Sequence, residues 1–140
     1  MRSATHSELD STQGMALLLG RLLMAALFIV AGVRKAMAFS ASAGYMVKNG
    51  VPMAEFLLVL TLVLEIGGGL MLVLGWKTRW ISLVLAIFVA VITPIFHGFW
   101  AFDGAQFTPQ LNNFLKNIAI VGGLLYFAVF GAGRLSLDSR

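Results

Sequence analysis

The chain has 140 residues, of which 59% are hydrophobic and only 11% are charged. A soluble domain is about 45–50% apolar and about 25% charged, and so short a chain cannot hide the excess apolar surface in a core. The composition therefore excludes a soluble monomer and a disordered chain. The ten Lys and Arg residues are scattered and form no patch of the kind that binds nucleic acid. The lack of cysteine excludes a disulfide scaffold and any thiol chemistry within this chain.

Four apolar runs follow in chain order, each close to the length at which a helix crosses a bilayer. With the neighbouring Pro and Gly residues taken as helix ends, the predicted spans are residues 15–33, 53–75, 80–97 and 112–132. They form one domain, residues 15–133, between an N-terminal tail at 1–14 and a C-terminal tail at 134–140.

A shorter amphipathic segment separates the first two runs. Phe39, Ala43 and Met46 recur at helical spacing before the break at Asn49-Gly50, which predicts a short interfacial helix. We therefore expect an all-α membrane protein, a four-transmembrane-helix bundle with a short interfacial helix between helices 1 and 2.

The positions of the basic residues indicate how the chain is oriented in the membrane. Arg34 and Lys35 follow the first run directly, where the cleavage region of a signal peptide is neutral, so we expect this run to be retained as a span. An even number of spans places both termini on one side, and that side holds five Lys and Arg residues against four on the other. The positive-inside rule therefore favours cytoplasmic termini by a narrow margin.

Two charges interrupt the apolar runs. Glu65 lies near the middle of the second span, where an acidic side chain costs about 2.5–3.5 kcal/mol on insertion scales. Arg21, in the first span, comes within ~6 Å of the same depth when 1.5 Å is counted per residue. Two interpretations stay open for this pair: an interhelical ion pair that locks the bundle, and a proton or ligand site at a buried acid. Arg21 alone could instead snorkel to the headgroups.

A second polar group is predicted toward the opposite membrane face. Lys35, His97, Lys116 and Asn117 fall at one depth and are candidates to line a ligand pocket, because hydrogen-bond donors suit a quinone carbonyl or a small anion. The alternative for each is interfacial anchoring or capping. The sequence contains no nucleophile–base pair and no metal-ligand cluster, and its second histidine, His6, lies in the N-terminal tail and cannot form a bis-His haem site with His97 inside the bundle. We therefore expect no catalytic residues, metal, haem or covalently bound cofactor.

These motifs, taken in order, resemble the DoxX family of small bacterial membrane proteins over about residues 15–133. The resemblance rests on Gly20-Arg21, Ile29 to Lys35, Leu64-Glu65 with the following glycines, Gly75-Trp76-Lys77-Thr78-Arg79, Thr93 to Trp100, Leu115-Lys116-Asn117 and Gly122-Gly123. It implies a four-helix inner-membrane bundle with both termini cytoplasmic. The family's recurrent polar positions fall on Arg21, Lys35, Glu65, Arg79, His97, Lys116 and Asn117.

The resemblance also implies a functional context. Related proteins are described as membrane subunits of a thiosulfate:quinone oxidoreductase, or as membrane partners in thiol and oxidative-stress systems. We therefore expect a subunit or anchor of a quinone-linked redox complex, with lipid, other protein subunits and a quinone as partners, and no nucleic acid. Any enzymatic role would be that of a subunit. The alternatives are a non-catalytic accessory subunit that packs against a larger membrane complex and, third, a small transporter that uses Arg21 and Glu65.

Overall fold

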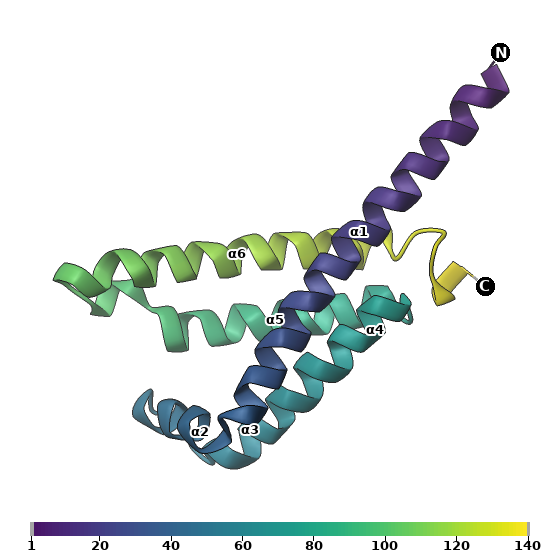
Figure 1. Cartoon of the computed structure of the whole chain (residues 1–140). Helices are drawn as coiled ribbons and strands as arrows, with labels where there is room; N and C mark the ends of the chain where they lie inside the picture. The colour runs from purple at the N-terminus through teal and green to yellow at the C-terminus, as the bar shows by residue number, and fades with distance from the viewer. Residues whose placement is uncertain (1, 140) are drawn as a thin grey trace.

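The computed structural model describes the backbone of residues 2–139 and the side chains of residues 11–139; Met1 and Arg140 lie outside the described residues. Within that range every regular element is helical (Figure 1). The main elements are α1 (Arg2–Met37), α2 (Phe39–Lys48), α3 (Ala54–Leu62), the π-helical segment η1 (Val63–Gly67), α4 (Gly68–Leu74), α5 (Thr78–His97) and α6 (Phe107–Phe130). Short 3₁₀ turns complete the described chain: η2 (Phe99–Ala101), η3 (Gly104–Gln106) and η4 (Leu137–Ser139).

Four helical stretches are long and apolar enough to cross a membrane, at residues 11–37, 54–74, 78–101 and 104–130. The predicted fold class is thereby confirmed, and α2 occupies the place of the predicted short helix. Two helices are longer than their apolar runs. The backbone of the predicted N-terminal tail continues α1 up to Arg2, and α6 begins at Phe107. Hydrophobicity sets which part of a helix lies in lipid, and polar residues extend the helix beyond it.

The helices form two pairs. In one pair α1 runs along α3, η1 and α4, and in the other α5 runs along α6. Gly32 and Gly69 permit the close approach in the first pair, because a Cβ on Gly69 would lie 2.6 Å from Ile29 Cγ1 and one on Gly32 would lie 2.7 Å from Ile66 Cγ1. The two pairs meet where α4 contacts α5 and diverge toward the other end of the molecule (Figure 1).

The core lies where the two pairs meet. Its fully buried members are apolar side chains from all four spans, including Ala25, Phe28, Leu72, Leu85 and Leu124. We call the nearby end, formed by the turn at residues 75–77 and by residues 131–139, the terminal end. The opposite end, formed by α2 and residues 98–106, is the open end. The divergence of the helix pairs leaves a space toward the open end, and that space contains the candidate site.

Candidate functional site

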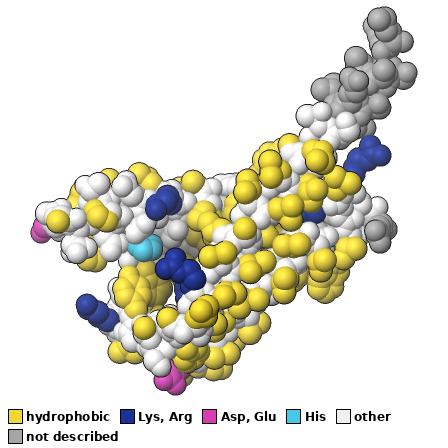
Figure 2. Space-filling model, in the orientation of Figure 1, with side chains coloured by type: hydrophobic (Ala, Val, Ile, Leu, Met, Phe, Trp, Pro, Cys, Tyr) yellow, Lys and Arg dark blue, Asp and Glu magenta, His cyan; other side chains and the backbone are white. Residues whose placement is uncertain are grey.

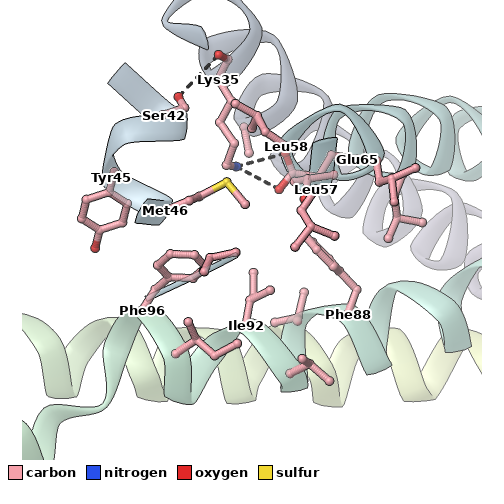
Figure 3. Close-up of a pocket in the computed structure, with 18 of the residues that line it drawn as sticks. Lys35, Ser42, Tyr45, Met46, Leu57, Leu58, Glu65, Phe88, Ile92 and Phe96 are labelled. Carbon is pink, nitrogen blue, oxygen red and sulfur yellow. Dashed lines mark hydrogen bonds and ion pairs between the residues drawn. The ribbon is translucent and has the colours of Figure 1, made fainter. Parts of the chain in front are cut away.

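A cavity of about 780 Å³ lies between the two helix pairs. Its walls are mostly aliphatic and aromatic side chains from α1, α2, α3, α5 and α6. Figure 3 shows Lys35 and Glu65 on one wall and Phe88, Ile92 and Phe96 of α5 on the facing wall. The surface view is hollowed between the two helical arms, with Lys or Arg and His side chains near the hollow (Figure 2). The size and the apolar lining with few polar groups are typical of a small-molecule site.

An ion pair forms the polar part of one wall. Lys35 Nζ lies 2.9 Å from Glu65 Oε1 and 3.0 Å from Oε2. The Glu65 side chain is 4% exposed and that of Lys35 is 37% exposed, so the pair is open to its surroundings on the lysine side only. An ammonium group has three N–H donors, and the two contacts with Glu65 leave one of them for another acceptor.

Glu65 lies within the π-helical segment Val63–Gly67. Single π turns inside α-helices are frequent at functional sites, because the wider turn changes the direction of side chains and disturbs the regular backbone bonding. No pattern in the sequence predicted this segment. This π-helical segment orients the Glu65 side chain toward α1.

The predicted pair of Arg21 with Glu65 is wrong. The Arg21 guanidinium donates 2.7 Å hydrogen bonds to the backbone carbonyls of Ala132 and Leu135, and a longer one of 3.5 Å to that of Val73. The reason is the direction of helical side chains, which lean toward the N-terminus of their own helix. Arg21 therefore leans toward the terminal end, whereas Glu65, on an antiparallel helix, leans toward the open end. Lys35 leans back along α1 into the membrane and meets Glu65.

Arg21 also does not snorkel. Its side chain is buried, with 1% exposure, and it holds the chain segment after α6 against the end of the bundle. In the same place Asp138 accepts hydrogen bonds from the backbone N–H groups of Lys77 (2.6 Å) and Thr78 (2.8 Å), and its own N–H donates to Gly75 O. Partial burial acts to raise the pKa of Asp138, but hydrogen bonds from Thr78 and Lys77 and the charge of Arg21 outweigh it, so the pKa lies below its ordinary value.

Two of the other predicted pocket residues line the cavity together with Lys35. His97 Nδ1 lies 2.9 Å from Gln110 Oε1, which fixes the imidazole at the end of α5. Asn117 Nδ2 donates to Thr93 Oγ1 (3.0 Å), and this hydroxyl donates to Val89 O (2.6 Å). These bonds join α5 to α6 and place both polar side chains at the cavity wall.

Lys116 is not brought to this pocket. Its side chain is exposed and it is absent from the cavity walls. The i, i+1 relation to Asn117 explains the difference, because successive residues of a helix point about 100° apart. The sequence argument placed both residues at one depth without separating the faces of the helix.

Sequence reasoning missed the contribution of α2. Tyr45 stacks on Phe96 with ring centroids 5.6 Å apart and an interplanar angle of 20°, which connects α2 to α5 across the cavity. Ser42 Oγ donates to Lys35 O at 3.4 Å. Tyr45 follows Ser42 by three residues on the predicted amphipathic segment, and this spacing was the available signal that both face the bundle.

The fold defines a small polytopic helical membrane protein with a cavity between its helices. The chain belongs to the DoxX family, whose model matches residues 16–98. It is similar to the inner membrane protein YqjF of Escherichia coli, at 37% identity over 86% of this chain and 88% of that protein. It is also similar to the Escherichia coli inner membrane protein YphA, at 29% identity over the full length of both.

A more distant similarity extends to eukaryotes. The ER-derived vesicles protein ERV29 of Saccharomyces cerevisiae is 27% identical over 96% of this chain, which corresponds to 36% of that longer protein. No solved structure matches the chain significantly. The predicted family resemblance is confirmed, and the protein is a DoxX-family integral inner-membrane protein.

Proposed function

We propose that this protein is the membrane subunit of a quinone-linked redox complex and that its cavity holds the quinone. The observation that carries the proposal is the cavity itself, an apolar space of about 780 Å³ that reaches the Lys35–Glu65 ion pair between the membrane-spanning helices. A quinone combines a flat ring bearing two carbonyl acceptors with a long apolar tail. The cavity offers aromatic and aliphatic walls and a small number of donors, which is the matching chemistry.

The donors are the groups left with unused hydrogens. Lys35 keeps one N–H beyond those used by Glu65. The second ring nitrogen of His97 donates in the tautomer in which Nδ1 accepts from the Gln110 amide, and in the other tautomer it accepts from a quinol hydroxyl. Glu65 has two roles in this proposal. It lowers the cost of a lysine inside the membrane. In our proposal the Lys35 ammonium donates a proton to a reduced quinone oxygen, and the Glu65 carboxylate takes up a proton from water and returns it to Lys35.

The electrons would come from another polypeptide. This chain has no cysteine, and its described residues contain no group of three or more potential metal ligands. The redox centre in our proposal is therefore a partner subunit, and this chain supplies the membrane anchor and the quinone site. No catalytic residue, metal or haem is assigned to it.

A thermal-stability measurement tests the ligand. Decylubiquinone added to the purified protein in detergent should raise the unfolding midpoint, because a ligand at a hundred times its Kd stabilises the folded state by about 2.7 kcal/mol. Ile92→Trp, which fills the cavity, should abolish the shift. Ile87→Trp is the matched control, because Ile87 lies on the same helix, is 57% exposed and does not line the cavity.

The donors are tested by the same titration. His97→Ala should weaken quinone binding about tenfold, the equivalent of one lost hydrogen bond, whereas Lys116→Ala should leave it unchanged. Equal unfolding midpoints with and without quinone would contradict quinone binding.

Purification from native membranes in mild detergent tests the complex, which should contain a partner with the visible absorption of a flavin, haem or iron–sulfur centre. A stable complex without quinone or redox centre would instead identify a non-catalytic accessory subunit.

We also propose that both termini are cytoplasmic. The terminal side carries Arg2, Lys77, Arg79, Arg134 and Arg140, and the open side carries Arg34, Lys35, Lys48 and Lys116. The charge of Lys35 is neutralised by Glu65, which widens the difference in favour of the terminal side. A C-terminal alkaline phosphatase fusion should be inactive and a C-terminal green fluorescent protein fusion should be fluorescent; the reverse result would invert the topology.

A further inference from the structure

The Gly75-Trp76-Lys77-Thr78-Arg79 segment has no part in the cavity or in the proposed quinone chemistry. It borders a second hollow, of about 750 Å³, at the terminal end of the bundle. The hollow lies between the start of α5 and the end of α6. Two basic side chains, two large aromatic side chains and the backbone of residues 131–133 line it, together with Thr78, Asp138 and Ser139.

The two cations of this hollow have no acidic partner among the described residues. Lys77 Nζ lies 5.5 Å from the centroid of the Trp76 ring, a cation–π contact that leaves its charge in place. The Arg79 side chain lies along Gly131, where a Cβ would be 3.3 Å from Arg79 Nε. Gly131 has φ +81°, so the glycine permits both the turn and the close approach of the guanidinium.

The one acid that lines the hollow is already engaged. Both carboxylate oxygens of Asp138 accept backbone N–H groups, one from Lys77 and one from Thr78. The carboxylate therefore serves the first turn of α5, where the helix dipole favours an anion. The side-chain charges of Lys77 and Arg79 stay available for an external anion.

The aromatic side of the hollow indicates what kind of molecule carries that anion. Trp80 is 71% exposed and Phe130 is 61% exposed, and both lie at the ends of membrane-spanning helices. Aromatic residues at this position are typical of the level of the lipid headgroups. One turn deeper along the same two helices, the exposed side chains of Val84 and Tyr126 continue this surface into the membrane. A basic hollow thus opens onto an apolar surface.

We propose that this hollow binds the phosphate group of an anionic phospholipid, with Arg79 and Lys77 on the phosphate and the acyl chains along Trp80 and Phe130. Basic pockets between transmembrane helices are a known form of anionic lipid recognition. Free phosphate carries the same negative charge but has no apolar part to contact the exposed aromatic side chains. For this reason we assign the site to lipid. The site is independent of the cavity and of the proposed quinone function.

Lipid retention tests this proposal. The full-length protein is reconstituted into nanodiscs of equal phosphatidylglycerol and phosphatidylcholine, extracted in mild detergent, and analysed for retained lipid by native mass spectrometry. The wild type should retain phosphatidylglycerol in preference to phosphatidylcholine. Each substitution, Lys77→Gln or Arg79→Gln, should weaken that retention about fivefold, the effect of one basic residue near an anionic surface. Arg79→Lys, which keeps the charge, should restore most of it.

The matched control is the double variant Arg34→Gln with Lys48→Gln, which removes one arginine and one lysine that are exposed toward the open end. It should retain phosphatidylglycerol like the wild type, and an equal loss would overturn the site in favour of a general charge effect. Inorganic phosphate, titrated in lipid-free detergent with thermal unfolding as readout, distinguishes the source. Trp80→Ala should lower lipid retention and leave any phosphate effect unchanged. Stabilisation by phosphate without a preference for phosphatidylglycerol would overturn the lipid assignment.

Discussion

The two ends of this molecule handle buried charge in different ways. At the terminal end, the guanidinium of Arg21 is fully enclosed and its two terminal nitrogens donate to backbone carbonyls of the chain that follows α6. At the open end, Lys35 is paired with a buried carboxylate and stays partly exposed beside a large cavity. Both arrangements give polar partners to charges that lipid cannot solvate, but of these two cations only Lys35 lines a cavity.

The difference separates a structural charge from a candidate functional one. A buried ionisable group inside a membrane is a functional hypothesis by default, and both Arg21 and Glu65 met that criterion in the sequence. The contacts assign Arg21 to holding the fold together, because its hydrogen bonds go to backbone groups and it lines neither the cavity nor the hollow described above. Lys35 and Glu65 keep the functional interpretation. Four predictions break or sharpen this comparison, in order of decreasing expected effect.

Arg21→Met should have the largest effect, because it leaves the carbonyls of Ala132 and Leu135 without donors. We expect a loss of about 4 kcal/mol in the free energy of unfolding, since hydrogen bonds to charged groups contribute about 1.5–3 kcal/mol each. Denaturant titration in detergent measures it, and the segment at residues 131–139 should become sensitive to protease. Arg34→Met removes an exposed arginine of the same helix and should change neither. Wild-type stability of Arg21→Met would contradict the structural assignment.

Lys35→Met should cost about 2 kcal/mol, because it leaves Glu65 buried without a partner, although the adjoining cavity moderates the penalty. Glu65→Gln should cost less, since the partly exposed Lys35 can turn to water or lipid headgroups. The combination of Lys35→Met with Glu65→Leu should recover most of the loss. A double-mutant cycle from unfolding titrations gives the coupling energy, and additive costs would show that the pair contributes nothing as a pair.

Asp138→Ala should cost about 1 kcal/mol at neutral pH, the usual effect of removing a side chain that caps a helix. The folded pKa of Asp138 lies below its ordinary value. Its contribution is therefore fully present above the ordinary pKa and is lost as the pH falls through the folded pKa. The stability difference between wild type and variant should shrink on acidification. Asp103→Ala, which removes an exposed acid at the open end, serves as control, and a difference that grows at low pH would be inconsistent with this capping.

Tyr45→Ala should have the smallest effect on stability, about 0.5–1 kcal/mol for one aromatic pair. It removes the stack on Phe96 that connects α2 to α5, so α2 should exchange its amide hydrogens faster while α5 and α6 stay unchanged. Tyr45→Phe keeps the stack and should behave like the wild type. Unchanged exchange in α2 after Tyr45→Ala would show that other contacts hold this helix.

The fold was predictable because each span is a long apolar run and lipid requires every backbone group in it to be satisfied within the helix. The short helix was predictable from the spacing of Phe39, Ala43 and Met46. The π-helical segment was not, because the sequence around Glu65 contains no signal that distinguishes a π turn from an α turn. The docking of residues 131–139 depends on contacts between residues more than a hundred positions apart, which hydropathy does not report.

The candidate site was predicted in part. Depth alone placed Lys35, His97 and Asn117 together, and these three line the cavity. The depth of the Cα atoms gave the wrong partner for Arg21, because helical side chains lean toward the N-terminus of their helix. It gave the wrong place for Lys116, because depth does not distinguish the faces of a helix. The Arg21 error would have been avoided by projecting each side chain toward the N-terminus of its helix, and the Lys116 error by assigning each residue to a face of its helix. Partners on other helices, such as Gln110 for His97, still require the fold.

The hydrogen bonds of Arg21 have a consequence for how the protein is made. Arg21 is synthesised 111 residues before Ala132, its partner, and translation at about 5–20 residues per second separates the two by roughly 6–20 seconds. During that interval the first span enters the membrane with a cation that has no internal acceptor and must stay near water or headgroups. The backbone N–H group of Thr78 in the first turn of α5 also has no Asp138 carboxylate to bind until the C-terminal residues are synthesised. Closure of the terminal end is therefore a late event of biogenesis, which an insertion machinery would have to accommodate.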